Sequence, residues 1–314
     1  MGIHIAQIGT GRVGRPTAYT LLCNGLASKL TVCDVKPGLA KAFSEELLHV
    51  TASNGFDVEI VDCEDDEDVQ EADVILITAG EPRLPGVEMS RRDLVLKNAK
   101  VIRNIAEATA SHNPRAKYIV ITNPVDTMAM VFQTYSKSEF VLSTGTNLES
   151  LRFRSRFAKH LKVPVSKVKG WVGGEHGDAA TILWSTVKVN NLSVDEYVQS
   201  SGIEFNKNEI ESYMRKISKF IVDSIGGTEY GPAASFTDIV RAIIQDTQET
   251  LAIATPLKFE TIPEPVYVSV PLKLGKSIGS NDFENLLEEE KKEIVGAARI
   301  IYDNFLMAVK GLAD

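Results

Sequence analysis

The chain has 314 residues, which predicts two domains at roughly 100–200 residues per domain. Hydrophobic residues make up 44% and charged residues 24%, values that exclude disorder, collagen-like repeats or coiled coil for the chain as a whole. Lys and Arg number 34 against 42 Asp and Glu, giving a net charge of −8. Nucleic acid is therefore excluded as the main partner, because phosphate binding needs a basic face, although a few local arginines can still hold a small anion.

The apolar stretches and the cysteines indicate in which cellular compartment the protein is expected. No apolar stretch approaches the roughly 20 residues that cross a bilayer, and the first residues run into an apolar segment without a charged leader, so we expect a cytoplasmic protein without a membrane partner. The three cysteines, Cys23, Cys33 and Cys63, form no CxxC or Cys/His pattern. We expect reduced, small, buried side chains and no metal site.

The first 145 residues alternate short apolar runs with helical patterns. Runs of this kind are typical of strands buried on both faces of a parallel sheet. The expected strands are 3–8, 29–33, 57–61, 73–78, 117–122 and 140–143, and the expected helices are 13–24, 38–52, 91–111 and 124–135. This alternation predicts a doubly wound α/β (Rossmann) sheet as an NAD-binding domain over residues 1–145.

The second half, residues 146–314, has a different pattern and is expected to form an α+β catalytic domain. Helices are expected at 147–161, along an amphipathic stretch at 193–224, at 231–246 and at 281–310. A hairpin-like segment pairs 251–255 with 266–274.

A glycine-rich turn, GTGRVG at 9–14, lies between the first expected strand and helix. Gly9 is expected to make the tight turn, Gly11 to let the backbone approach a pyrophosphate, and Gly14 to let helix pack close to strand. The N–H groups at the start of the helix then face the phosphates. The whole turn is expected to bind a dinucleotide: Gly9, Thr10, Gly11, Arg12, Val13 and Gly14.

An acidic residue, Asp34, ends the second strand 20 residues after Gly14, where a carboxylate can accept both adenosine ribose hydroxyls. It favours NAD over NADP, because a 2′-phosphate would meet like charge there. Lys36, two residues further on, can soften this preference.

A catalytic histidine is expected in GGEHGD at 173–178, where the alternative for His176 is a structural, partly buried side chain. Glu149 and Arg152 lie three apart on a predicted helix and therefore share a face. The alternative for Arg152 is a solvated basic face. TNPVD at 122–126 follows a buried strand, at the sheet edge where α/β proteins bind ligands.

Taken together, GTGRVG, Asp34, TAGEPRLPG, ITNPVD, GTNLESLRFR and GEHGD resemble the lactate/malate dehydrogenase superfamily in order over essentially the whole chain. Within it the chain resembles the malate dehydrogenases that are similar to lactate dehydrogenases. The resemblance implies that His176 exchanges the proton, that Glu149 orients it in place of the usual Asp, and that Arg152 clamps the substrate carboxylate. It also implies that Asn123 binds the substrate oxygen beside the nicotinamide, and that the peptide bond to Pro124 is cis.

A polar loop at 81–93 is expected to form a lid over the substrate, its alternative being an ordinary surface loop. The resemblance places Arg83 where malate dehydrogenases read the distal group of the substrate. It makes Arg91 the lid arginine that polarises the carbonyl, with Arg92 as its competitor.

Weaker correspondences concern residues at the rim of the expected site. The resemblance places Asn98, Gly80 and Thr122 near the cofactor and Thr228 near the substrate. Asn98 can equally be an exposed helical asparagine, and Thr228 can cap a helix.

The resemblance implies an NAD-dependent malate dehydrogenase of the tricarboxylic acid cycle, without a metal, acting on a small dicarboxylate and assembled as a homotetramer. One alternative is a lactate or other 2-hydroxyacid dehydrogenase on the same scaffold. Another is a silent NAD-binding sensor, against which the presence of His176, Arg152 and Arg91 argues.

Overall fold

A parallel sheet forms the first half of the chain, as the apolar runs predict. The structure, a computed structural model, describes residues 2–81 and 90–313, without the side chain of Arg91. Six parallel strands lie in the order β3-β2-β1-β4-β5-β6. Their bounds are β1 (His4–Ile8), β2 (Lys29–Cys33), β3 (Glu59–Cys63), β4 (Val74–Ile77), β5 (Lys117–Val120) and β6 (Val141–Ser143). This order confirms the doubly wound sheet.

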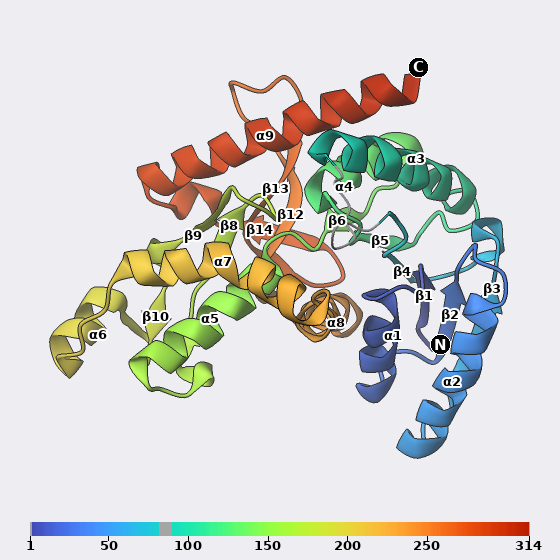
Figure 1. The fold of residues 1–314 in the computed structure, drawn as a ribbon, viewed down its shortest axis with the longest axis horizontal. Helices are drawn as coiled ribbons and strands as arrows, with labels where there is room; N and C mark the ends of the chain where they lie inside the picture. The colour runs from blue at the N-terminus through green and yellow to red at the C-terminus, as the bar shows by residue number, and fades with distance from the viewer. Residues whose placement is uncertain (1, 82–89, 314) are drawn as a thin grey trace.

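Helices cover both faces of this sheet (Figure 1). Those of the first half are α1 (Gly14–Cys23), α2 (Leu39–Asn54), α3 (Arg91–Thr109) and α4 (Val125–Ser136). Apolar side chains of α1 and α2 pack on one face, and those of α3 and α4 pack on the other. Both faces of β1, β2, β4, β5 and β6 are therefore buried, which explains why these strands are largely apolar without alternation, whereas the edge strand β3 is partly exposed.

The second half extends the same sheet with antiparallel strands. The path continues from β6 through β12, β13 and β8 to β9, with β14 against β13, and β7, β10 and β11 form a separate small sheet. The strand bounds are β7 (Val168–Lys169), β8 (Val172–Gly174), β9 (Ala180–Ile182), β10 (Lys188–Val189), β11 (Leu192–Ser193), β12 (Glu249–Leu257), β13 (Val266–Leu274) and β14 (Ile278–Asn281). The expected hairpin is confirmed as β12 paired with β13.

Of the helices of the second half, the last two join the two layers on the faces of the sheet (Figure 1). The helices of this half are α5 (Asn147–Leu161), α6 (Val194–Ser201), α7 (Lys207–Ile225), α8 (Tyr230–Gln245) and α9 (Glu288–Ala313). Helix α8 packs beside α1, and α9 packs across α3 and α4, so both halves contribute to each layer.

Three expectations about local structure are wrong. The stretch 193–224 is two helices, because Gly202 ends α6 with a φ of +68°, a conformation that glycine adopts without strain. The last helix begins at Glu288 rather than near 281, since β14 and a short 3₁₀ turn occupy the preceding residues. Of the cysteines, which are all free thiols, Cys33 is buried but Cys23 is exposed.

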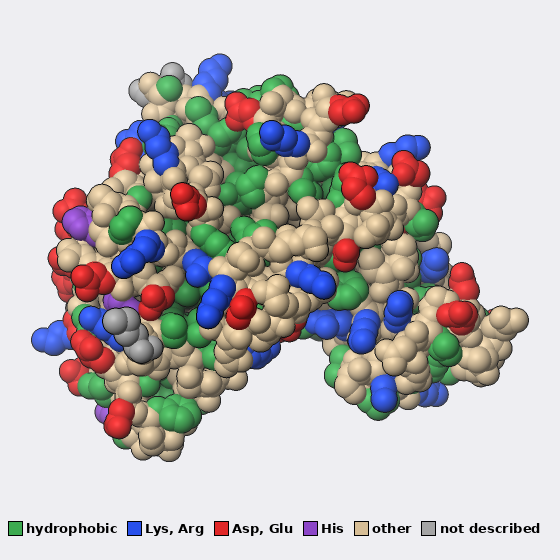
Figure 2. Space-filling view, turned by 180° about the vertical axis from the view of Figure 1, so that it is seen from behind, with side chains coloured by type: hydrophobic (Ala, Val, Ile, Leu, Met, Phe, Trp, Pro, Cys, Tyr) green, Lys and Arg blue, Asp and Glu red, His purple; other side chains and the backbone are tan. Residues whose placement is uncertain are grey.

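Charged side chains of both signs are spread over the surface, as expected from a sequence with similar numbers of basic and acidic residues. Figure 2 shows Lys and Arg side chains interspersed with Asp and Glu over the face it presents. Within residues 2–81 and 90–313, no helix is long and apolar enough to span a bilayer.

Candidate functional site

The glycine-rich turn has the shape that a dinucleotide needs. Gly9 has a φ of +94°, which an L side chain rarely adopts. A Cβ on Gly14 would lie 2.1 Å from the Gly9 carbonyl oxygen, so helix α1 packs directly on the turn. At Gly11 a Cβ would meet no atom within 4 Å, which leaves the backbone open to a ligand from outside. The turn and the start of α1 therefore fit a pyrophosphate, although α1 has no side-chain cap.

Asp34 lies beside this turn at the end of β2. Its Oδ2 accepts hydrogen bonds of 2.8 Å from both the N–H and the hydroxyl of Thr10, and its Oδ1 accepts 3.0 Å from the Lys36 N–H. The carboxylate is thus held at the carboxyl edge of the sheet and is partly accessible. Its position fits the ribose contact expected from the spacing.

Asn98, on α3, joins the segments that follow β4 and β5. Its Nδ2 donates to the Asn123 carbonyl at 2.6 Å, and its Oδ1 accepts from the Glu81 N–H at 2.7 Å. A Cβ on Gly80 would lie 2.5 Å from Thr122 and 3.0 Å from Asn98, so these positions are in contact. Asn98 is 1% exposed, which makes the alternative of an exposed helical asparagine wrong. The Asn123–Pro124 peptide bond is cis.

Arg12 connects the glycine-rich turn to the second half of the chain. Its Nη1 pairs with Glu229 at 2.9 Å, and its side chain packs on Gly227. Val13 is the N-cap residue of α1. Thr228 lies next to Glu229 and is half-buried; because Glu229 is the N-cap residue of α8, the alternative that Thr228 caps this helix is wrong.

His176, Glu149 and Arg152 form a connected cluster between α5 and the segment after β8. Glu149 Oε2 lies 3.0 Å from His176 Nδ1, and Glu149 Oε1 accepts 3.1 Å from Arg152 Nη1. The glutamate therefore reaches the imidazole despite its extra methylene. An ionised carboxylate only accepts, so Nδ1 carries the hydrogen and Nε2 is the ring atom left to exchange a proton. The side chains are 25%, 12% and 14% exposed for His176, Glu149 and Arg152.

The charges in this cluster favour a protonated histidine. Burial alone would lower the pKa of His176, but the charge of Glu149 and its hydrogen bond outweigh burial and raise that pKa to about 9. Burial alone would raise the pKa of Glu149, but His176 and Arg152 hold it below its ordinary value. His176 therefore stays protonated at neutral pH, next to the ionised carboxylate of Glu149.

Asp126, a residue of TNPVD with no role predicted from the sequence, touches the same cluster. Its Oδ2 accepts 2.9 Å from the His176 backbone N–H, and its Oδ1 accepts 2.5 Å from the Ser143 hydroxyl. It is 2% exposed. An acidic residue in the first turn of a helix that follows a buried strand was the signal available in the sequence.

The lid falls largely outside the described residues. Arg83 belongs to 82–89, and the side chain of Arg91 is also outside them. Arg91 is the first residue of α3, whose N-cap Ser90 accepts a hydrogen bond from the Asp93 N–H. Arg92 is exposed on this first turn.

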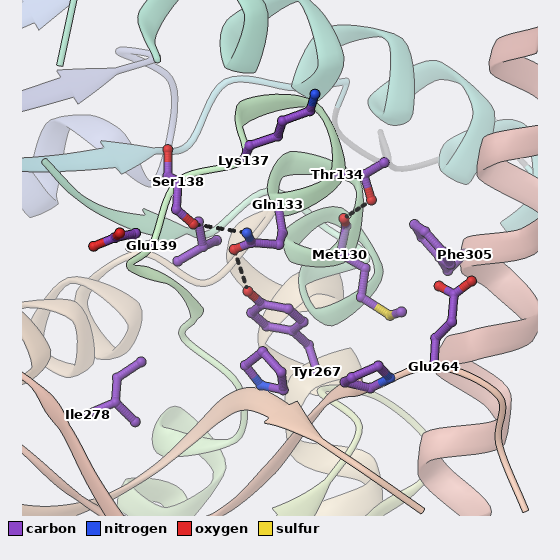
Figure 3. A pocket seen from close by; sticks show the side chains of 13 residues that line it. Met130, Gln133, Thr134, Lys137, Ser138, Glu139, Glu264, Tyr267, Ile278 and Phe305 are labelled. Atoms are coloured by element: carbon purple, nitrogen blue, oxygen red, sulfur yellow. Dashed lines mark hydrogen bonds between the residues drawn. The ribbon is translucent and has the colours of Figure 1, made fainter. Parts of the chain in front are cut away.

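A separate cavity of about 560 Å³ lies near the far end of α4, between that helix, the β12–β13 hairpin and α9 (Figure 3). Tyr267 donates to Gln133 Oε1 at 3.0 Å beside it, and Phe305 lines it from α9. None of the described residues predicted for cofactor or substrate lines this cavity. Among the described residues there is also no group of three or more His, Cys, Asp or Glu arranged to hold a metal ion.

Comparisons with known proteins agree with the site. The lactate/malate dehydrogenase NAD-binding domain matches residues 3–140, and the lactate/malate dehydrogenase α/β C-terminal domain matches residues 146–305. A malate dehydrogenase of Sulfurisphaera tokodaii is 42% identical, covering 92% of this chain and 90% of the relative. One from Sulfolobus acidocaldarius is 38% identical, covering 99% and 98%. An L-lactate dehydrogenase of Mycoplasma mobile is 31% identical, covering 98% of each chain.

Solved structures show the same fold. Malate dehydrogenase from Plasmodium falciparum superposes with a TM-score of 0.90 at 27% identity, covering 98% of this chain and 99% of the other. Malate dehydrogenase from Archaeoglobus fulgidus in complex with NADH superposes with a TM-score of 0.86 at 28% identity, with the same coverage. NAD is therefore the cofactor that the open turn at Gly11 and the carboxylate of Asp34 fit.

Proposed function

Since the chain belongs to the lactate/malate dehydrogenase family of NAD-dependent oxidoreductases, we propose that it is a malate dehydrogenase interconverting malate and oxaloacetate. The observation that carries the proposed oxidoreductase chemistry is the contact of His176 with Glu149 and of Glu149 with Arg152. It joins a proton donor, a carboxylate that keeps the donor charged, and a guanidinium suited to binding a substrate carboxylate.

His176 supplies the proton in this proposal. With its Nδ1 hydrogen held by Glu149, the imidazolium gives the proton on Nε2 to the ketone oxygen of the oxoacid, and takes it back from the hydroxyl of malate. Glu149 stays ionised throughout and stabilises the charged ring, as the buried carboxylate of a catalytic triad does.

NAD supplies the hydride transfer when it is bound. Asp34 would hold the adenosine ribose of the cofactor, and the turn at Gly11 would hold its pyrophosphate. Asn123 binds the substrate oxygen. The side-chain amide of Asn98 fixes Asn123 in place by donating a hydrogen bond to the backbone carbonyl of Asn123. Arg152 binds the carboxylate next to the reacting carbon, for which a planar guanidinium offers paired donors.

The choice of malate rests on Arg83 and on the relatives. Relatives at 42% and 38% identity bear the name malate dehydrogenase, and one at 31% bears the name L-lactate dehydrogenase. A dicarboxylate pairs one carboxylate with Arg152 and the other with Arg83. Pyruvate would leave Arg83 desolvated without a partner, which costs several kcal/mol. We expect Arg91 to close over the carbonyl with the lid, Arg92 being the alternative.

The test is to measure NADH oxidation with oxaloacetate and with pyruvate, in the unmodified chain and in Arg83→Gln. We expect the unmodified chain to prefer oxaloacetate by up to about 10⁴-fold in kcat/KM, and the variant to move toward pyruvate. Arg115→Gln, at an exposed arginine between α3 and β5, is the matched control and should leave the ratio unchanged.

Three outcomes separate the candidate functions. An unmodified chain that prefers pyruvate is a lactate dehydrogenase. One that binds NADH but reduces no 2-oxoacid is a silent NAD-binding protein. An Arg83→Gln variant that keeps the full preference for oxaloacetate removes Arg83 from the specificity site.

A further inference from the structure

Asp126 is a buried carboxylate in which both oxygens accept hydrogen bonds. It lies in the first turn of α4, three residues after Asn123, and is 2% exposed. The His176 N–H donates to Oδ2 at 2.9 Å, and the Ser143 hydroxyl donates to Oδ1 at 2.5 Å. Burial of a carboxylate is costly unless it is hydrogen-bonded in this way, so its presence beside His176 needs a reason.

The hydrogen bonds of Asp126 continue into the segment that leads to Glu149. The Ser143 hydroxyl, at the end of β6, accepts 3.1 Å from the Gly145 N–H, and Glu149 follows in the first turn of α5. Asp126 is therefore bonded both to the main chain of His176 and to the strand end from which the helix of Glu149 starts.

We propose that Asp126 is a positioning residue for the reaction: it fixes His176 through the main chain while Glu149 fixes the same residue through the ring. This inference rests on the proposed function of His176 as the proton donor. His176 is then held at two points by carboxylates from two helices: its backbone N–H by Asp126 of α4, in the first half, and its ring by Glu149 of α5, in the second. With only the ring contact, the imidazole would follow any shift of the segment after β8.

The charge of Asp126 also favours the protonated form of His176. Burial, with a smaller contribution from the charge of Glu175, raises the pKa of Asp126 to about 6, against the hydrogen bonds from Ser143 and the His176 N–H and the charge of His176. Above this pH the carboxylate is ionised and, together with Glu149, favours the protonated form of His176, whereas Arg152 opposes it. Loss of the Asp126 charge should therefore lower the pKa of His176.

Two substitutions separate anchoring from charge. Asp126→Asn keeps an oxygen that accepts from the His176 N–H but removes the charge, while Asp126→Ala removes both. We expect kcat to fall about 100-fold in Asp126→Ala, the effect of misplacing a catalytic group by about 1 Å, with the KM for the oxoacid nearly unchanged. We expect a smaller fall in Asp126→Asn, with the alkaline limb of its pH–rate profile displaced to lower pH.

Glu290→Gln is the matched control. Glu290 is also a buried carboxylate in the first turn of a helix, and it also accepts from a backbone N–H and from a hydroxyl, both of Ser185. This substitution should lower the melting temperature about as much as Asp126→Asn does, because both replace a buried acceptor, but it should leave the pH–rate profile unchanged.

NMR titration of the His176 imidazole gives a second readout, which needs no turnover. In Asp126→Asn its midpoint should lie below that of the unmodified chain. Equal midpoints in the two proteins, or a wild-type kcat in Asp126→Ala, would overturn the proposal. Kinetics are measured with whichever oxoacid the unmodified chain reduces, so a preference for pyruvate contradicts the proposed substrate but not the role of Asp126. If no oxoacid is reduced, the proposed function fails and the NMR midpoint alone decides the effect of Asp126 on His176.

Discussion

The cofactor edge and the catalytic cluster lie in one sheet but are built in different ways. The cofactor edge uses the main chain: the left-handed Gly9, the open backbone of Gly11, and a carboxylate, Asp34, that is partly accessible. The catalytic cluster uses charged side chains: the buried Glu149 contacts Arg152 and His176, and the buried Asp126 accepts from the backbone N–H of His176.

Because of this difference, the cofactor edge should respond mainly to changes in backbone conformation and the catalytic cluster mainly to changes in protonation state. A site made of main-chain groups depends on conformation and changes little with pH in the neutral range. A site made of buried charges depends on the protonation state of each member, and the loss of one charge changes the pKa values of the rest. Substitutions at the cluster should therefore affect rate and pH dependence, whereas substitutions at the cofactor edge should affect affinity.

The largest effect should follow from removing the proton donor. In His176→Asn we expect kcat to fall about 10³-fold, within the range that general acid catalysis contributes, while NADH affinity stays near that of the unmodified chain. Stopped-flow NADH oxidation and fluorescence titration measure the two quantities. His160→Asn, near the end of α5, is the control. A tenfold loss of NADH affinity in His176→Asn would contradict the proposal that substitutions in the catalytic cluster affect rate rather than cofactor affinity.

Glu149→Gln should give the next largest effect. It nearly keeps the shape of the side chain but removes the charge that faces the imidazole, so we expect kcat to fall about 10²-fold to 10³-fold. Glu107→Gln, an exposed residue of α3, is the control. Turnover within about twofold of the unmodified chain would remove Glu149 from the mechanism.

Stability should depend on pH through His176. Its pKa in the folded chain, about 9, lies above its ordinary value of 6.5. The pair therefore contributes stability that is fully present below about pH 6.5 and is lost as pH rises through about 9. We expect the free energy of unfolding to fall over this window by about 2–3 kcal/mol more than in His176→Asn, measured by urea denaturation. Equal pH dependence in both proteins would contradict the raised pKa.

Asp34→Ser should give the smallest effect on kcat and should change cofactor affinity and selection. Without its carboxylate the ribose pocket no longer repels a 2′-phosphate, so the preference for NADH over NADPH should fall about tenfold with kcat nearly constant. Steady-state kinetics with both cofactors measure it. An unchanged preference means that Asp34 does not select the cofactor.

Much of the fold was predictable from local sequence. Strands buried on both faces are largely apolar, so β1, β2 and β5 appear as short apolar runs, and these runs alternate with helical patterns. The break at Gly202 was missed because apolar residues recur at helical spacing in both α6 and α7, and a single glycine does not by itself end a helix.

The parts of the site that lie at strand ends, or at fixed spacing within one motif, were predictable from the sequence. Glu149 and Arg152 were expected on one face of a helix, and they lie in contact there. The role proposed for Asp126 was not predictable, because its partners Ser143 and His176 are 17 and 50 residues away and only tertiary packing brings them together. The geometry of Arg83 stays a prediction, since this residue lies outside the described ranges.

A buried carboxylate, Glu149, keeps His176 protonated for transfer to an oxoacid. The pH dependence of kcat/KM for oxoacid reduction by NADH, compared between the unmodified chain and Glu149→Gln, measures this effect. We expect an alkaline midpoint near 9 in the unmodified chain and a lower midpoint in the variant. The same midpoint in both proteins would show that Glu149 does not control the proton on His176.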